Sequence, residues 1–254
     1  MKFEIHGATD PGRKRRENED AYCICEDIGF CMVADGMGGH AAGEVASATA
    51  VQVAQDFIRR RAIDKDLPWP CGFIKNITKA ENILVTSLQL ANQKVCALSR
   101  QNPDYFGMGT TVAALYWHQN EAALAHIGDS RVYRIQDNVI EQLTFDHSWV
   151  NEQLKNKLIT EEEAKKHRWR NVITRALGNK DEVEIDTHTE KIQPGDMFVL
   201  CTDGLSSMVN DDRLLSIAMD NKTNPEKTCT QLVKEANKNG GLDNITVILM
   251  RCVS

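Results

Sequence analysis

The stretch of sequence that decides the fold reads Phe30-Cys31-Met32-Val33-Ala34-Asp35-Gly36-Met37-Gly38-Gly39-His40. Its first five residues are apolar without a break, which is typical of a strand that is buried on both faces of a sheet. The run stops at Asp35-Gly36, a pair that favours a turn, and a glycine-rich segment follows. We therefore expect a buried strand that delivers the Asp35 carboxylate to a loop.

Patterns on either side of this stretch predict a layered α+β fold. Strands are expected at 3–8, 21–28, 184–189, 197–202 and 245–252, helices at 43–61, 79–100, 212–219 and 225–238, and hairpins at 110–127 and 131–143. Consecutive hairpins indicate antiparallel sheets, and pairs of long helices between runs of strands argue against strict βαβ alternation. No linker-like stretch divides the chain, so we expect one domain spanning residues 1–254.

Overall charge and hydrophobicity exclude several classes of protein. The 254 residues include 30 Lys and Arg against 36 Asp and Glu, a net charge of −6, and 42% are hydrophobic. An acidic chain lacks the positive field that attracts nucleic acid or anionic membranes, and no stretch approaches the roughly 18–20 apolar residues that cross a bilayer. The chain begins without the apolar stretch of a secretion signal, and its eight cysteines lack paired C-x-x-C spacing. We expect a cytoplasmic protein with no nucleic-acid or membrane partner.

Aspartates recur where an apolar strand meets a glycine-containing turn or an acidic loop. The five positions are Asp20 after Asn18-Glu19, Asp35-Gly36, Gly128-Asp129, Asp203-Gly204 and Gly241-Leu242-Asp243. Each alone is an ordinary turn residue, but five carboxylates on the ends of neighbouring strands form a cluster of like charge that needs a cation. Oxygen ligands select Mg²⁺ or Mn²⁺, whereas the motifs that bind zinc are absent from the sequence. Two such ions can share a hydroxide that attacks phosphorus in line.

Two basic features lie close to these carboxylates along the chain. Arg13-Lys14-Arg15-Arg16 is either a solvated loop or, beside a metal site, a grip for phosphate oxygens. His40 is either polar surface or a proton donor to a leaving oxygen. Other hydrolase chemistries lack their signatures, because no cysteine has an arginine six positions later and neither G-x-S-x-G nor a phosphate-binding P-loop occurs.

Eight segments spread over nearly the whole chain form an ordered series. They are Thr9-Asp10-Pro11-Gly12 with Arg15 and Asn18-Glu19-Asp20; Val33-Ala34-Asp35-Gly36-Met37-Gly38-Gly39-His40; Gly109-Thr110-Thr111; Gly128-Asp129-Ser130-Arg131; Asp146-His147-Ser148; Thr174-Arg175-Ala176-Leu177-Gly178; Cys201-Thr202-Asp203-Gly204-Leu205; and Asp243-Asn244-Ile245-Thr246. In this series the chain resembles the metal-dependent serine/threonine protein phosphatases of type 2C, the PPM family, in their compact bacterial form. Each segment alone is a weak signal, and eight in register are a strong one.

The resemblance implies a four-layer α-β-β-α sandwich, in which two antiparallel sheets are flanked by helix pairs. It implies a single phosphatase catalytic domain with a flap segment at about 147–173 beside the catalytic cleft. The implied reaction is hydrolysis of phosphoserine and phosphothreonine on proteins, with two Mn²⁺ or Mg²⁺ ions and a third, weaker site. In the mechanism that the resemblance implies, a hydroxide that bridges the metals would attack phosphorus, and no phosphoenzyme would form. The expected partners are phosphorylated substrates of a serine/threonine kinase, and the expected oligomeric state is a monomer.

The same resemblance assigns metal-binding roles to individual residues. Asp35 would bridge both metals, and the carbonyl oxygen of Gly36 would bind the second. Asp203 and Asp243 would be the remaining side-chain ligands of the first metal. Asp20 would lie beside the second metal, either as a direct ligand or through water.

Further roles follow from the resemblance for residues around the metals. Glu19 would be an acidic neighbour of the second metal, and Asp129 would share the third with Asp203. Arg15 would bind the phosphate, His40 would act as the general acid, and Asn244 would support the metal site by hydrogen bonding.

Two functions from other classes stay open alongside the phosphatase interpretation. One is a binding module that senses a partner or a metal without catalysis, which would be indicated if the chain bound no divalent ion in calorimetry. The other is a phosphodiesterase or nuclease built on the same ions, which would prefer a phosphate diester to a monoester. Fold alone does not decide among these functions, because one fold hosts many activities.

Overall fold

Strand β3 (Phe30–Met37) of the computed structural model explains the uninterrupted apolar run. Phe30 and Met32 point into a core beneath two helices, whereas Cys31 and Val33 point into a core between two sheets. Successive side chains of a strand face opposite sides, so a strand buried on both faces is apolar at every position. The expected buried strand is therefore present at the centre of the fold.

Two five-stranded antiparallel sheets face each other in residues 1–38 and 42–253, the part of the chain that the structure describes. The order in the first sheet is β2 (Asp20–Cys25), β3, β4 (Gly109–His118), β5 (Glu121–Ile127) and β8 (Asp186–Lys191). The order in the second sheet is β1 (Phe3–Asp10), β10 (Ile245–Cys252), β9 (Met197–Cys201), β6 (Arg131–Gln136) and β7 (Val139–Gln142). Alternate side chains of both sheets form one shared core between them.

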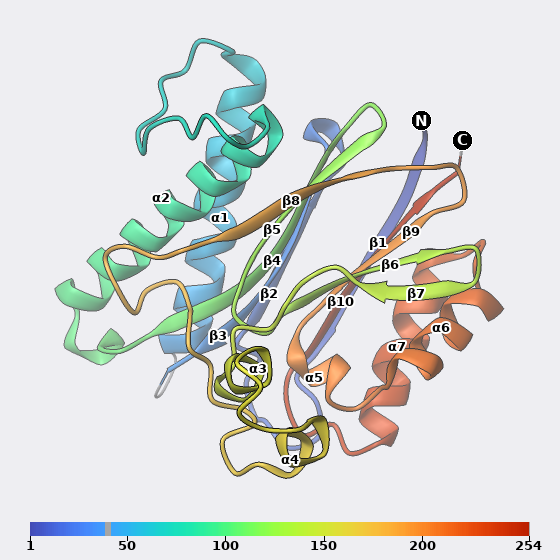
Figure 1. Ribbon diagram of the computed structural model, residues 1–254. Coiled ribbons are helices and arrows are strands. Elements are labelled where there is room, and N and C mark those ends of the chain that lie inside the picture. The colour runs from blue at the N-terminus through green and yellow to red at the C-terminus, as the bar shows by residue number, and fades with distance from the viewer. Residues whose placement is uncertain (39–41, 254) are drawn as a thin grey trace.

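A pair of helices covers the outer face of each sheet (Figure 1). The pairs are α1 (Ala42–Ile63) with α2 (Lys79–Gln101) on the first sheet, and α6 (Asp211–Asp220) with α7 (Pro225–Lys238) on the second. Local signals set the helix starts, because Thr78 and Glu81 form a reciprocal capping box at α2 and the side chain of Asn224 caps α7. The predicted α+β class and its α-β-β-α layering are confirmed.

The prediction that Asp35 lies in a loop is wrong. Asp35 and Gly36 belong to β3, where they pair with Thr111 and Thr110 of β4. The ladder continues past the apolar run because the neighbouring strand supplies partners up to Gly109, and backbone pairing does not require an apolar side chain. Asp35 thus occupies a fixed position in the sheet.

The structure also contains a helix that the sequence patterns did not predict. Asp203, expected at a turn after a strand, is the first residue of the short helix α5 (Asp203–Ser206). A carboxylate in the first helical turn is stabilised by the unpaired N–H groups there, and four residues are too few to show helical periodicity.

The segment expected as a flap leaves the sandwich and returns to it at nearly the same place. It contains α3 (Trp149–Lys155) and α4 (Glu161–Lys166), and an isolated bridge between Ser148 and Ile173 joins its two ends. Two short 3-10 helices, η1 (Glu26–Ile28) and η2 (Pro103–Tyr105), complete the described elements. Among the described helices, none is at once long enough and apolar enough to span a membrane.

Candidate metal centre

Strands β2 and β3 bring the first two predicted ligands together. Asp20 opens β2 and lies directly opposite Asp35 in the antiparallel register. The next residue of β3, Gly36, donates its N–H to the carbonyl oxygen of Glu19 at 3.1 Å. A Cβ on Gly36 would lie 2.1 Å from the carbonyl oxygen of Gly43, so glycine is required for α1 to approach the strand this closely.

The second sheet contributes ligands from α5 and from the turn before β10. Asp203 directly follows Thr202 at the end of β9, and Asp243 lies two residues before β10. A Cβ on Gly204 would lie 1.9 Å from the carbonyl oxygen of Asn244, so glycine allows α5 to pack against this turn. Asp129, which follows β5 of the first sheet, faces the same cluster, because the charge of Asp203 acts on it.

Burial and mutual repulsion raise the pKa values of these carboxyl groups. Burial raises the pKa of Asp35 well above its ordinary value of 3.8, and the charges of Asp20, Asp203, Asp129 and Asp243 raise it further. Burial is also the first cause of the pKa of about 7 at Asp20 and at Asp129, and it raises the pKa of Asp203. The five carboxylates therefore lie close enough to repel one another, which favours binding of a cation.

Three carboxylate oxygens of the cluster have no hydrogen-bond partner in residues 1–38 and 42–253. They are the Oδ1 atoms of Asp20, Asp129 and Asp203, and each is buried. Native proteins pair nearly all buried polar atoms, so unpaired oxygens on charged groups indicate a partner from outside the chain. Carboxylate oxygens are the ligands of hard divalent ions, so the donor set fits Mn²⁺ or Mg²⁺.

Arg15 is the member of the basic run that reaches the cluster. Its Nη2 donates to Oδ2 of Asp243 at 2.8 Å, and 54% of its side chain is exposed. The hydrogen bond to Asp243 raises the pKa of Arg15, and the charges of Glu19 and Asp35 add to the effect. A half-exposed guanidinium at the edge of the carboxylates has donors to offer to a ligand from solvent.

Asn244 ties the loop that carries Arg15 and Glu19 to the start of β10. Its Oδ1 accepts the N–H of Glu19 at 2.8 Å, and its Nδ2 donates to the carbonyl oxygens of Pro11 at 3.0 Å and Glu17 at 2.9 Å. Glu19 itself lies against α1, because a Cβ on Gly43 would come within 2.7 Å of its Oε2 atom. Burial raises the pKa of Glu19, and the charge of Arg15 opposes that shift.

His40, the predicted general acid, lies outside the described residues. The other nine predicted site residues are described, and they gather at one end of the two sheets.

A second group of ligand-type side chains was missed by the sequence analysis. His126, His147 and Asp186 place their ligand atoms within 4.8 Å of one another. Nδ1 of His147 accepts the N–H of Gly128 at 3.1 Å, so in the neutral ring the proton is on Nε2, which faces Asp186 at 3.3 Å. In that tautomer Nε2 of His147 is protonated and is not available to a metal. Reciprocal hydrogen bonds between His147 and Gly128 anchor the start of the flap segment to the end of β5.

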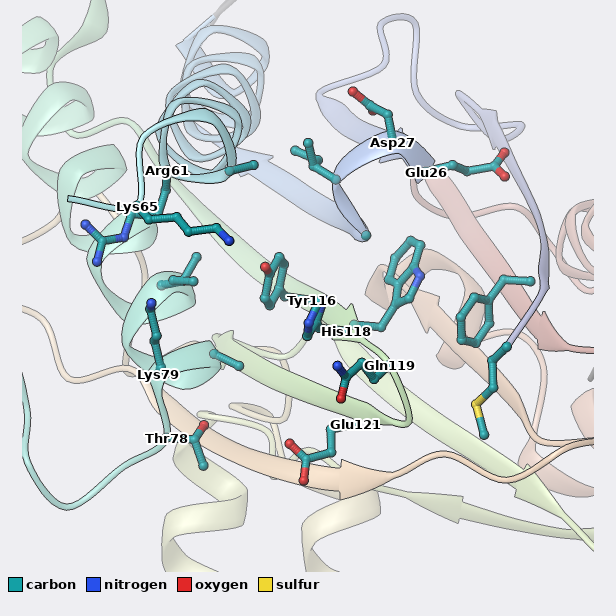
Figure 2. Close-up of a pocket in the computed structure, with 18 residues that line it drawn as sticks. Glu26, Asp27, Arg61, Lys65, Thr78, Lys79, Tyr116, His118, Gln119 and Glu121 are labelled. Atoms are coloured by element: carbon teal, nitrogen blue, oxygen red, sulfur yellow. The ribbon is translucent and has the colours of Figure 1, made fainter. Parts of the chain in front are cut away.

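A cavity of 790 Å³ lies at the opposite end of the first sheet (Figure 2). Figure 2 shows Lys65 and Lys79 on the side of the two helices, with Glu26 and Glu121 across from them. Both signs of charge line this cavity, and none of the predicted site residues does. The cavity and the carboxylate cluster therefore lie at different ends of the first sheet.

Comparison with known proteins shows the family of the chain. The family model described as Protein phosphatase 2C matches residues 13–239. The protein phosphatase PhpP of Streptococcus pneumoniae is 39% identical over 251 residues, which cover 98% of this chain and 97% of PhpP.

Solved structures show the same fold. The serine/threonine phosphatase PstP/Ppp of Mycobacterium tuberculosis superposes with a TM-score of 0.86 at 32% identity, covering 99% of both chains. The catalytic domain of PstP in complex with two manganese ions matches with a TM-score of 0.83, also at 32% identity and 99% coverage of both chains. The chain therefore belongs to the protein phosphatase 2C family of metal-dependent serine/threonine protein phosphatases, the family and enzyme class that the sequence motifs indicated.

Proposed function

We propose that this chain hydrolyses phosphoserine and phosphothreonine monoesters on proteins, with Mn²⁺ or Mg²⁺ held at the carboxylate cluster. Asp20, Asp35, the carbonyl oxygen of Gly36, Asp203 and Asp243 would hold the two principal ions, and Asp129 would share a third, weaker site with Asp203. The observation that carries the proposal is the convergence of five carboxylates with three buried, unpaired oxygens. The protein supplies no cation for those oxygens within the described residues, so the donor set calls for divalent ions.

The chain's own groups bind and orient the phosphate. Arg15 extends from the loop that Asn244 fixes, and its exposed donors suit two oxygens of a phosphoryl group. Bound divalent ions supply the positive charge that makes water a nucleophile near neutral pH and neutralises the phosphoryl oxygens. The phosphoryl group passes directly to water without a phosphoenzyme, as in the mechanism expected from the family resemblance. His40 protonates the departing seryl or threonyl oxygen.

The proposal extends to the organisation and setting of the enzyme. Residues 1–254 form one catalytic domain, and the segment at 147–173 is a flap beside the cleft. The substrates are proteins phosphorylated by a serine/threonine kinase, and the enzyme works as a cytoplasmic monomer. Buried thiols such as Cys31, Cys201 and Cys229 are free, which suits a reducing compartment.

Metal depletion and restoration test the proposed reaction. Chelation is expected to abolish hydrolysis of p-nitrophenyl phosphate and of a phosphothreonine peptide, and added Mn²⁺ to restore both. Hydrolysis that survives complete metal removal contradicts the proposal. A preference for bis-p-nitrophenyl phosphate indicates a phosphodiesterase, and the absence of Mn²⁺ binding in titration calorimetry indicates a binding module.

A further inference from the structure

The two carboxylate oxygens of Asp20 have different surroundings. Oδ2 accepts hydrogen bonds from Oγ1 of Thr202 at 2.9 Å and from Oγ1 of Thr246 at 2.6 Å. Oδ1 is buried and has no hydrogen-bond partner among the described residues. One oxygen is therefore held by the protein, and the other is left for a ligand in the cluster.

The direction of every hydrogen bond around Oδ2 can be assigned. Ionised Asp20 can only accept, so Thr202 and Thr246 each donate their single hydroxyl proton to it. Thr246 is 2.7 Å from Oγ1 of Thr9, and because its own proton is used, Thr9 must be the donor in that contact. Thr9 in turn accepts a bond from Nδ2 of Asn18 at 2.8 Å. Hydrogen bonds thus run in one direction, from Asn18 through Thr9 and Thr246 to Asp20.

The backbone and burial of the two inner threonines fix their hydroxyl groups. Thr202 and Thr246 are fully buried at the ends of neighbouring strands β9 and β10. Oγ1 of Thr202 accepts the N–H of Thr246 at 3.0 Å, and the N–H of Thr202 donates to the carbonyl oxygen of Thr246 at 3.1 Å. A threonine side chain is also stiff about its first torsion. The two hydroxyls are therefore oriented before any ligand arrives.

We propose that Thr202 and Thr246 are positioning residues of the metal centre, which hold Oδ2 of Asp20 so that Oδ1 faces the bound ion. Thr9 and Asn18 extend this network by fixing the direction of the hydrogen bond that Thr246 makes. The inference rests on the proposed function, because it assigns Asp20 to a divalent ion. Groups that orient a metal ligand typically change metal affinity by about 10- to 100-fold when they are removed.

The experiment compares Thr246→Val, which removes the hydroxyl at nearly constant volume, with Thr246→Ser, which keeps it. The matched control is Thr228→Val, because Thr228 is also fully buried and its hydroxyl donates to the backbone carbonyl oxygens of Asn221 and Asn224, between α6 and α7. Titration calorimetry measures Mn²⁺ affinity, and thermal unfolding in chelator measures the stability of the metal-free protein. Both readouts are independent of catalytic activity.

Thr246→Val is expected to weaken Mn²⁺ binding by about 10- to 100-fold, with Thr246→Ser close to the wild type. Thr228→Val is expected to lower the melting temperature without changing Mn²⁺ affinity. Equal Mn²⁺ affinity in the wild type and Thr246→Val overturns the inference, and a wild type that binds no Mn²⁺ contradicts the proposed function instead.

A second variant covers the case in which Thr246→Val does not fold. Thr9 is exposed, so Thr9→Val removes the outer hydroxyl without emptying a buried site. Because Thr246 keeps its bond to Asp20, Thr9→Val is expected to weaken Mn²⁺ binding by a smaller factor than Thr246→Val, through lost polarisation of the network. If the Mn²⁺ affinity is unchanged in both Thr9→Val and Thr246→Ser, the proposal that this hydrogen-bond network positions Asp20 is contradicted.

Discussion

Two groups of aspartates in this molecule have opposite kinds of neighbour. Asp146 accepts three bonds from Arg131, at 2.7 to 3.1 Å, and Asp196 accepts a bond from Arg134 at 2.6 Å. Each of these carboxylates faces a guanidinium from the same chain. In the cluster around Asp35, the neighbours of Asp35 are other carboxylates, and Arg15 pairs with Asp243 at the edge.

The difference separates a structural carboxylate from a functional one. A buried charge needs a counter-charge, and where the chain supplies an arginine the pair holds two segments together. Where carboxylates face one another instead, as around Asp35, their repulsion favours binding of a cation from outside the chain. The paired and unpaired aspartates should therefore respond to substitution in opposite ways.

The largest expected effect is the loss of catalytic activity in the variant Asp35→Asn. Loss of the carboxylate at the centre of the cluster should lower kcat/KM for p-nitrophenyl phosphate by about 10³-fold or more, on the scale of lost electrostatic stabilisation in a buried site. The same change removes a repelled charge, so the metal-free protein should melt at the same or a higher temperature. A melting temperature well below that of the wild type would place Asp35 with the paired aspartates.

The next largest effect is the loss of folding stability in the variant Asp196→Ala. Breaking its pair with Arg134 leaves a buried guanidinium short of a partner, which should cost about 3 kcal/mol of unfolding free energy. Denaturant unfolding measures this cost, and kcat/KM per folded molecule should stay unchanged. If Asp196→Ala lost much activity without losing stability, the distinction between the arginine-paired aspartates and the carboxylate cluster would be wrong.

A smaller effect is expected for Arg15→Ala. Loss of the guanidinium should lower kcat/KM by about 10²-fold, because charge-assisted bonds to the phosphoryl group are lost. Mn²⁺ affinity should hold or increase, because Arg15 no longer competes for Asp243. Arg13→Ala serves as the control from the same basic run, and equal losses in both variants would assign the effect to the general charge of the loop.

The smallest effect is the pH dependence of metal-free stability. The pKa of Asp20 is about 7 in the folded protein against an ordinary 3.8, so the folded state binds more protons than the unfolded state between these values. Its contribution to stability is present below pH 4 and is lost as the pH rises through 7. In chelator, the melting temperature should therefore fall by a few degrees from pH 5 to pH 8. Asp20→Asn should make this fall smaller, with the remainder due to groups such as Asp129, and Asp196→Ala should leave the fall unchanged.

Local patterns were sufficient to predict the elements of the sandwich. The helix at Pro225–Lys238 and the strand at Ile245–Cys252 match the expected bounds, because apolar spacing and a proline at the first helical position are local signals. The hairpin turn at Asp137-Asn138 was also predictable, since both residues adopt positive φ values that asparagine and aspartate tolerate. The family was recognisable from its motifs.

Contacts between distant parts of the chain were not predictable from such patterns. The bond from Thr246 to Asp20 joins residues 226 positions apart, and its hydroxyl has no periodicity that would mark it. The pairing of Arg131 with Asp146, in contrast to the unpaired Oδ1 of Asp203, likewise depends on which strands become neighbours. The roles of the metal-site residues stay predictions until the variants above are measured.

The pairing of β1 with β10 has a consequence for synthesis of the protein. A ribosome releases Asp20 and Asp35 long before Asp203 and Asp243, yet all four belong to one cluster. The nascent chain therefore carries only part of the carboxylate cluster until β10 emerges and closes the second sheet. Binding of a divalent ion should therefore coincide with the last step of folding. The enzyme should become active only after the whole sandwich has been synthesised.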